Sequence, residues 1–209
     1  MGSDPWWGFE EAMEVAAEGE RARLLVEVLG ELRSAEPATW EATPAEAAGL
    51  EGSIAAELAR LGRMPFEEAA HLVARAWELA PAEWASYYLA QAAVRLVAYE
   101  EAAGALARIP DGWFESRDLL WREVHCWELA AIAHLGVGQR TEAEVAVERI
   151  VGTLAERAEP DDLAPPMDLL TWLRAHRTPA TEDLLEEVAA SAARVIEGWG
   201  SGSSRFTGA

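Results

Sequence analysis

The single cysteine of the chain lies next to a histidine in a segment that contains several potential metal ligands. His125 and Cys126 are adjacent, His134 follows, and Glu123 and Glu128 lie nearby. On one helix, His125 and His134 are separated by about two and a half turns, which places them on opposite faces. Cys126 and His134 are about 12 Å apart along the axis, too far to share one ion. We therefore expect no metal site and no cofactor, a buried cysteine and partly buried histidines.

The sequence also lacks the residues of nucleophilic and phosphate chemistry. Neighbours on a helix do not face each other, so His125 is badly placed to activate Cys126, and no Gly-x-Ser-x-Gly turn occurs. All 17 basic residues are arginine, which excludes lysine Schiff bases and a phosphate-binding P-loop. The chain offers no convincing catalytic residues, and an enzyme is the less favoured class of protein.

Charge and composition restrict the partners and the compartment. The net charge of −20 disfavours binding to nucleic acid and to anionic membranes. No apolar run has the length of a membrane span, the N-terminus does not resemble an export signal, and one cysteine cannot form an intramolecular disulfide. We expect a cytoplasmic protein. The absence of lysine and asparagine suggests a bacterial genome rich in GC.

Apolar residues recur at helical spacing along the chain, and no segment alternates like a strand, so an all-α fold is predicted. Thr43-Pro44-Ala45-Glu46 and Thr141-Glu142-Ala143-Glu144 resemble capping boxes, and Gly62 suits a left-handed helix end. The expected helices are 9–33, 44–61, 66–80, 82–96, 99–109, 117–135, 141–158, 167–176 and 181–197.

The helices are expected to form a single domain over residues 1–197. Trp6 and Trp7, two of ten tryptophans, precede the first predicted helix and could cover the core. A loop rich in proline and acid, 159–166, separates the last two helices from the rest. Residues 198–209 are rich in glycine and serine and are predicted to be disordered.

Three pairs of predicted helices share a sequence pattern within residues 45–157. The element Phe66-Glu67-Glu68-Ala69 returns after 33 residues as Tyr99-Glu100-Glu101-Ala102. The remaining shared residues are Ala55, Ala56, Leu58, Leu61, Gly62, Val73, Ala76, Leu79 and Pro81 in the first pair of helices and Trp127, Ala130, Ala131, Leu135, Gly138 and Ala143 in the third pair. This pattern resembles the tetratricopeptide repeat, in which alanines pack where helices cross closely.

The pattern also departs from that family. The turn at Met64-Pro65 is longer than the family's, the helix from Tyr99 is short, and Ala143 lies 41 residues beyond Ala102. A helical-repeat solenoid and an irregular helical bundle therefore both remain open as architectures.

The resemblance implies a groove lined by the first helix of each pair. A mixed surface of aromatic, amide and charged groups suits a peptide or a partner helix. The alternative is a groove filled by the chain's own C-terminal helices. The implied partner-binding residues are Trp84, Tyr87, Gln91, Val94 and Arg95 in the second pair of helices and His125, Glu128 and Ile132 in the third pair.

The expected function is that of a protein–protein interaction module: an adaptor, a chaperone-like protein or a regulatory subunit that binds another protein or a peptide. One alternative is a small-ligand or catalytic pocket between the Tyr87/Tyr88 helix and the His125/Glu128 helix. Another is a homo-oligomeric subunit of a larger particle, with Trp6, Trp7 and the tail as contacts.

Overall fold

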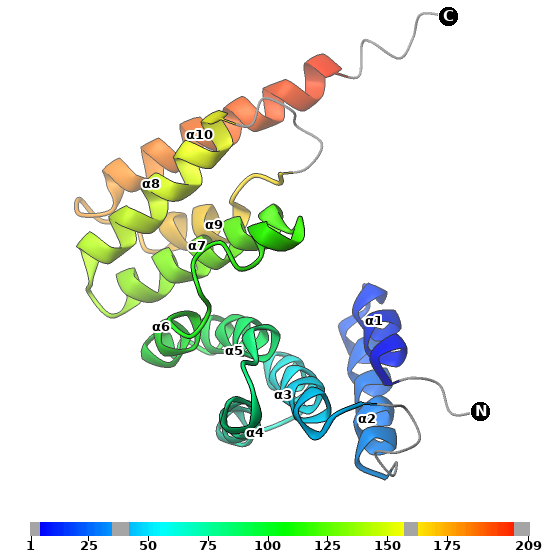
Figure 1. Cartoon of the computed structure of the whole chain (residues 1–209). Coiled ribbons are helices and arrows are strands. Elements are labelled where there is room, and N and C mark those ends of the chain that lie inside the picture. The colour runs from blue at the N-terminus through cyan, green and yellow to red at the C-terminus, as the bar shows by residue number, and fades with distance from the viewer. Residues whose placement is uncertain (1–4, 35–41, 157–162, 203–209) are drawn as a thin grey trace, which may run out of the picture. The chain divides into compact units, whose positions relative to one another are not determined.

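The computed structural model describes residues 5–34, 42–156 and 163–202, with side chains described as far as residue 197. These ranges contain ten α-helices, a short 3-10 helix and no strand, so the predicted all-α class is confirmed. None of the described helices is long and apolar enough to cross a membrane. The helices divide into two compact units, one ending at Ile109 and one beginning at Pro110 (Figure 1). The single domain expected from the sequence stays a prediction.

The first unit contains six helices that pack against their neighbours. Helix α2 packs on α1 and α3, α3 packs on α4 and α5, and α5 packs on α4 and α6. Their bounds are α1 Pro5–Glu14, α2 Glu18–Ser34, α3 Pro44–Arg60, α4 Phe66–Leu79, α5 Glu83–Arg95 and α6 Tyr99–Leu106.

In the second unit, helix α7 packs on α8 and α9, and α10 packs on both α8 and α9. The bounds are η2 Glu115–Arg117, α7 Leu120–Gly136, α8 Arg140–Glu156, α9 Met167–Ala175 and α10 Glu182–Gly202.

In three helix hairpins, α3–α4, α5–α6 and α7–α8, the first helix ends in the same kind of turn. The turn contains one residue with positive φ, which is 68° at Gly62, 62° at Val97 and 81° at Gly138. In each case its N–H donates to the carbonyl three residues back, and the next N–H donates to the carbonyl five residues back. This pair of hydrogen bonds satisfies the last carbonyls of the first helix, as in a Schellman cap. The predicted left-handed end at Gly62 is confirmed.

The hairpins also share buried alanines. Seven residues before each left-handed turn lies an alanine with no exposed surface, and the second helix of each hairpin carries another. Small side chains let helices approach closely: a Cβ atom added to Gly52 of α3 would lie 3.2 Å from the Cβ of Ala85 on α5. The alanines are Ala55, Ala90 and Ala131 in the first helices and Ala69, Ala102 and Ala143 in the second.

The long spacing between Ala102 and Ala143 arises in the connection between the second and third hairpins, not inside either of them. Val97 and Gly138 each precede the buried alanine of the next helix by five residues, whereas Gly62 precedes Ala69 by seven. The extra residues before Gly138 lie in the connection 107–119. This connection crosses the boundary between the two compact units.

The single helix predicted over 9–33 is wrong. Residues Val15–Ala17 are not helical, and they separate α1 from α2. Trp6 and Trp7 lie inside α1, not before it. The break lets α1 fold back onto α2 so closely that a Cβ atom on Gly8 would lie 2.9 Å from a Val28 methyl group.

Four other predicted boundaries differ from the structure. Helix α8 begins at Arg140, directly after the Gly138 turn, so Thr141 lies in its first turn and does not cap it. Helix α6 ends at Leu106, three residues early. Helix α7 begins at Leu120, because Asp118 adopts a left-handed conformation with φ of 59°. Helix α10 continues to Gly202, into the predicted tail, whose residues 203–209 lie outside the described ranges.

Candidate functional site

A group of aromatic side chains, the aromatic cluster, joins α1 to α5 within the first unit. Tyr87 and Tyr88 are neighbours on α5, with Trp84 one turn before them. The rings of Trp84 and Tyr88 stack with centroids 6.3 Å apart. The ring of Phe9 on α1 meets Tyr88 edge to face at 5.5 Å, and Trp6 meets Phe9 at 6.2 Å. Edge-to-face geometry is favourable for aromatic pairs and adds to their burial.

In the same unit, a buried carboxylate binds arginines from two helices. Glu57 on α3 is only 1% exposed. Its Oε1 accepts hydrogen bonds from Arg21 at 3.1 Å and Arg60 at 2.7 Å, and its Oε2 accepts a second bond from Arg60 at 2.7 Å. Burying a carboxylate is costly unless such partners compensate it. The bond to Glu57 raises the pKa of Arg60 above its ordinary value, although burial acts in the opposite direction.

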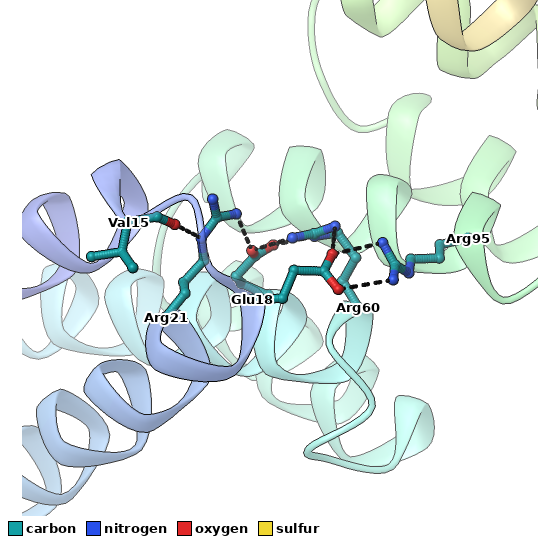
Figure 2. A network of polar contacts seen from close by, with 6 residues as sticks. Val15, Glu18, Arg21, Arg60 and Arg95 are labelled. Atoms are coloured by element: carbon teal, nitrogen blue, oxygen red, sulfur yellow. Dashed lines mark hydrogen bonds and ion pairs between the residues drawn. The ribbon is translucent and has the colours of Figure 1, made fainter.

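A second carboxylate connects Arg60 to an arginine of α5, as Figure 2 shows. Glu18, the first residue of α2, accepts two hydrogen bonds from Arg95, at 2.9 and 3.2 Å, and one from Arg60 at 3.4 Å. Glu18 and Arg95 are both about half exposed. The bond from Arg95 holds the pKa of Glu18 below its ordinary value. We use the name arginine cluster for Arg21, Arg60 and Arg95 with Glu18 and Glu57.

The arginine cluster also stabilises the break between α1 and α2. Val15 lies at this break, where its carbonyl has no helical partner among the described hydrogen bonds. The Nε of Arg21 donates to this carbonyl at 2.9 Å, while the same guanidinium binds Glu57 (Figure 2). One arginine therefore connects the break to the buried carboxylate of α3.

The five predicted binding residues of the second hairpin all lie on α5, in the first unit. Trp84, Gln91 and Val94 are half-buried, and Arg95 is exposed. Tyr87, in contrast, is only 2% exposed. The ring of Tyr88 next to it meets Phe9 of the N-terminal helix α1, whereas the alternative drawn from the sequence was a groove filled by C-terminal helices.

The three predicted residues of the third hairpin lie on α7, in the second unit. Ile132 is buried in the core of that unit. Glu128 is also buried, and its Oε2 accepts hydrogen bonds from the backbone N–H groups of Asp168 and Leu169, both at 3.1 Å. His125 is partly buried and lies 3.2 Å from the Asp168 carboxylate. The eight predicted residues thus belong to two units, and three of them are buried in this conformation.

Burial changes the protonation chemistry of α7. Loss of hydration raises the pKa of Glu128 to about 7, against the two backbone N–H groups and His125, which lower it. Burial also raises the pKa of the Cys126 thiol well above its ordinary value. Because the thiolate is the nucleophilic form, Cys126 is a poor nucleophile. Its predicted burial is confirmed. Within the described ranges, no three His, Cys, Asp or Glu residues are grouped to hold a metal ion.

Three buried glutamates organise these contacts, a role that the sequence did not predict for any of them, although Glu128 was predicted to bind a partner and Glu123 was weighed as a metal ligand. Glu57, Glu123 and Glu128 are buried, and each accepts hydrogen bonds from donors outside its own turn of helix. Glu123, for example, accepts from the backbone N–H groups of Gly112 and Phe114. The available signal was an acid inside an apolar run, such as Glu57 between Ala56 and Leu58. The sequence did not identify their partners, because most of them lie on other elements.

Comparison of the chain with protein-family models, curated proteins and solved structures found no match. The helical packing is compatible with a helical-repeat fold.

Proposed function

We propose that this protein is a protein–protein interaction module, an adaptor, chaperone-like protein or regulatory subunit, that binds a helix of another protein at the exposed side of α5. One observation carries the proposal: the aromatic residues of α5 already hold a helix of this chain, since Phe9 of α1 packs on Tyr88. A surface of stacked aromatic rings beside an arginine suits recognition of an amphipathic helix.

The tetratricopeptide-like nature of the module is part of the proposal. The shared turn of the three hairpins and their alanines in equivalent positions support it. We further propose that the protein acts in the bacterial cytoplasm, where a lone, buried cysteine stays reduced.

The proposal is tested by capture of a partner from a lysate of the source organism on the immobilised full-length protein. Arg95→Glu reverses a charge on the exposed side of α5 and should abolish capture, because a like charge repels an acidic partner. Arg75→Glu makes the same change on the exposed surface of α4 and should leave capture unchanged. Both variants should keep the melting temperature near that of the wild type, since exposed ion pairs contribute little stability. Equal capture by the two variants would exclude this surface of α5.

Self-assembly is a second candidate, favoured by the 70% exposure of the Trp7 side chain on α1. Exposed aromatic residues are enriched at protein interfaces. Light scattering of the wild type and Trp7→Ala separates this candidate from the first. A multimer in the wild type that becomes a monomer in the variant would support self-assembly, whereas a monomer in both would exclude it.

A further inference from the structure

Building on the proposed function, we propose that the α1–α2 segment is an intramolecular ligand, and that the partner displaces it with an acidic helix that carries an aromatic residue. Besides Arg21, which binds the buried Glu57, the segment supplies two groups to α3 and α5. Phe9 packs against Tyr88, and Glu18 binds Arg60 and Arg95 (Figure 2). These two contacts define the chemistry that a competing helix must reproduce.

The contact of Glu18 with Arg95 is of a kind that can be exchanged. Glu18 and Arg95 are about half exposed, and an ion pair of that kind contributes little stability and is weakened by salt. Helix α1 has ten residues, too few to be stable in water without packing. Helix α1 packs on α2, and α2 packs on α1 and α3, whereas α3 and α5 each pack on three helices. We therefore expect the segment to open at a lower free-energy cost than α3 and α5.

The surface left behind by α1–α2 would keep its structure. Glu57 would lose the hydrogen bond from Arg21 but keep the two from Arg60, which do not depend on Glu18. Arg95 would lose the carboxylate that it binds now. Tyr88 would lose the ring of Phe9 but keep its stacking on Trp84. A partner would meet an arginine pair beside an aromatic surface.

Charge identifies the partner helix as acidic. The chain has a net charge of −20, which opposes any acidic partner at long range. The segment bound now is nevertheless acidic: residues 5–34 contain seven glutamates and three arginines, a net charge of −4. Arg60 and Arg95 donate hydrogen bonds to one of those glutamates, Glu18, so the surface recognises a carboxylate locally. A displacing helix needs this carboxylate and an aromatic residue in place of Phe9.

The test uses full-length protein and a fluorescent peptide with the sequence of residues 5–34. In an opened variant, Phe9→Ala with Glu18→Ala, the segment loses the contacts of these two side chains and keeps that of Arg21 with Glu57, and the sequences of α3 and α5 are unchanged. The peptide should bind this variant at least about tenfold more tightly than the wild type, because the intramolecular competitor acts at a high effective concentration. A peptide carrying the same two alanines is the matched control and should not bind.

A third protein variant identifies the surface that the peptide occupies. Arg95→Glu, added to the opened variant, should remove peptide binding, and Arg75→Glu, added in the same way, should not. Equal affinity of the peptide for the wild type and the opened variant would overturn the proposal. So would peptide binding that Arg95→Glu does not affect.

Hydrogen exchange of the wild type tests the same idea without any variant. Amides of α1 and α2 should exchange at least about a hundredfold faster than those of α3 and α5, and about 1 M salt should increase the difference. Equal protection would show that α1–α2 is an integral part of the unit and would overturn the proposal, even if the opened variant failed to fold.

Two further measurements separate this inference from its alternatives. Light scattering of the wild type at the concentrations used should give one chain, and a dimer that the peptide dissociates would assign the surface to a second copy. The peptide titration needs no natural partner, so a negative result there overturns only the intramolecular ligand. The proposed function fails separately, if neither the wild type nor the opened variant captures a partner.

Discussion

At the scale of single residues, burial determines what the side chains of α5 and α7 can do. Tyr87 and Arg95 lie on the same helix, but the first is buried and the second is half exposed. A substitution at Tyr87 therefore reports on folding, and one at Arg95 reports on binding. The same distinction applies on α7, where Glu128 is buried and His125 is only partly buried.

We predict that Tyr87→Ala lowers the free energy of unfolding by about 3 kcal/mol, because it removes a large buried ring and leaves a cavity. Gln91→Ala, one turn further along the same helix and half-buried, should cost less than about 1 kcal/mol. Urea unfolding of both variants measures the difference. Equal stabilities would mean that the ring of Tyr87 is not packed as the structure describes.

Glu128 should make the stability of the protein depend on pH. Its pKa is raised in the folded state to about 7 from 4.5, so the folded protein holds this proton more tightly than the unfolded chain. The stability that Glu128 contributes is therefore fully present below about pH 4.5, falls as the pH rises to about 7, and stays low above it. The loss is on the order of 3 kcal/mol at most.

The matched variant for Glu128 is Glu128→Gln, which keeps an oxygen to accept from the N–H groups of Asp168 and Leu169 but cannot ionise. The free energies of unfolding of both proteins should be measured from pH 4.5 to 8. Their difference isolates residue 128, because the other titrating groups are common to both. Parallel curves would contradict the raised pKa.

At the scale of helices, the left-handed turn residue connects sequence to hairpin geometry. Gly62 and Gly138 have open space where a Cβ atom would lie, so only their backbone conformation favours glycine. Val97 occupies the same place with φ of 62° and is 66% exposed. A β-branched residue is strained in this conformation. The α5–α6 turn thus forms against the local preference of its own sequence.

We predict that Val97→Gly stabilises the protein by about 1 kcal/mol, because it removes this strain and sacrifices little buried surface. Gly62→Val should destabilise it by about 1–2 kcal/mol for the same reason. Thermal unfolding monitored by circular dichroism compares the two. A loss of stability in Val97→Gly would show that the exposed valine contributes a contact worth more than the strain.

At the scale of the whole molecule, the single-domain prediction requires that the two compact units unfold together. The sequence predicts one domain over residues 1–197. Gly62 lies in the first unit and Gly138 in the second, at equivalent turns. The two glycines therefore allow the same substitution to be made in each unit.

We predict that calorimetry of the wild type shows one transition, and that Gly62→Val and Gly138→Val each shift it as a whole to lower temperature. Two transitions, one sensitive to each substitution, would mean two independent domains and would contradict the single-domain prediction. The test needs no knowledge of how the units are arranged.

Features that depend on residues close together in the chain, such as most of the helices and the Gly62 turn, could be predicted from the sequence, whereas the Val97 turn could not. Apolar spacing predicts the all-α class, Gly62 predicts a left-handed helix end, and Thr43 predicts the capping box that the structure contains. At Thr141 and in the tail the error concerned the end of a helix and not its existence, whereas the break at Val15–Ala17 divides one predicted helix into two.

Which of these residues are accessible, and which carboxylates are paired, depends on contacts between distant segments. Arg95 meets Glu18 across 77 residues of sequence, and Phe9 meets Tyr88 across 79. Both contacts depend on the break at Val15–Ala17, which turns α1 back onto α2, and local periodicity does not encode that direction. The pattern of α5 could not predict that Phe9 of α1 packs on Tyr88, because contacts between distant segments follow from packing of the whole unit and not from the pattern of one helix.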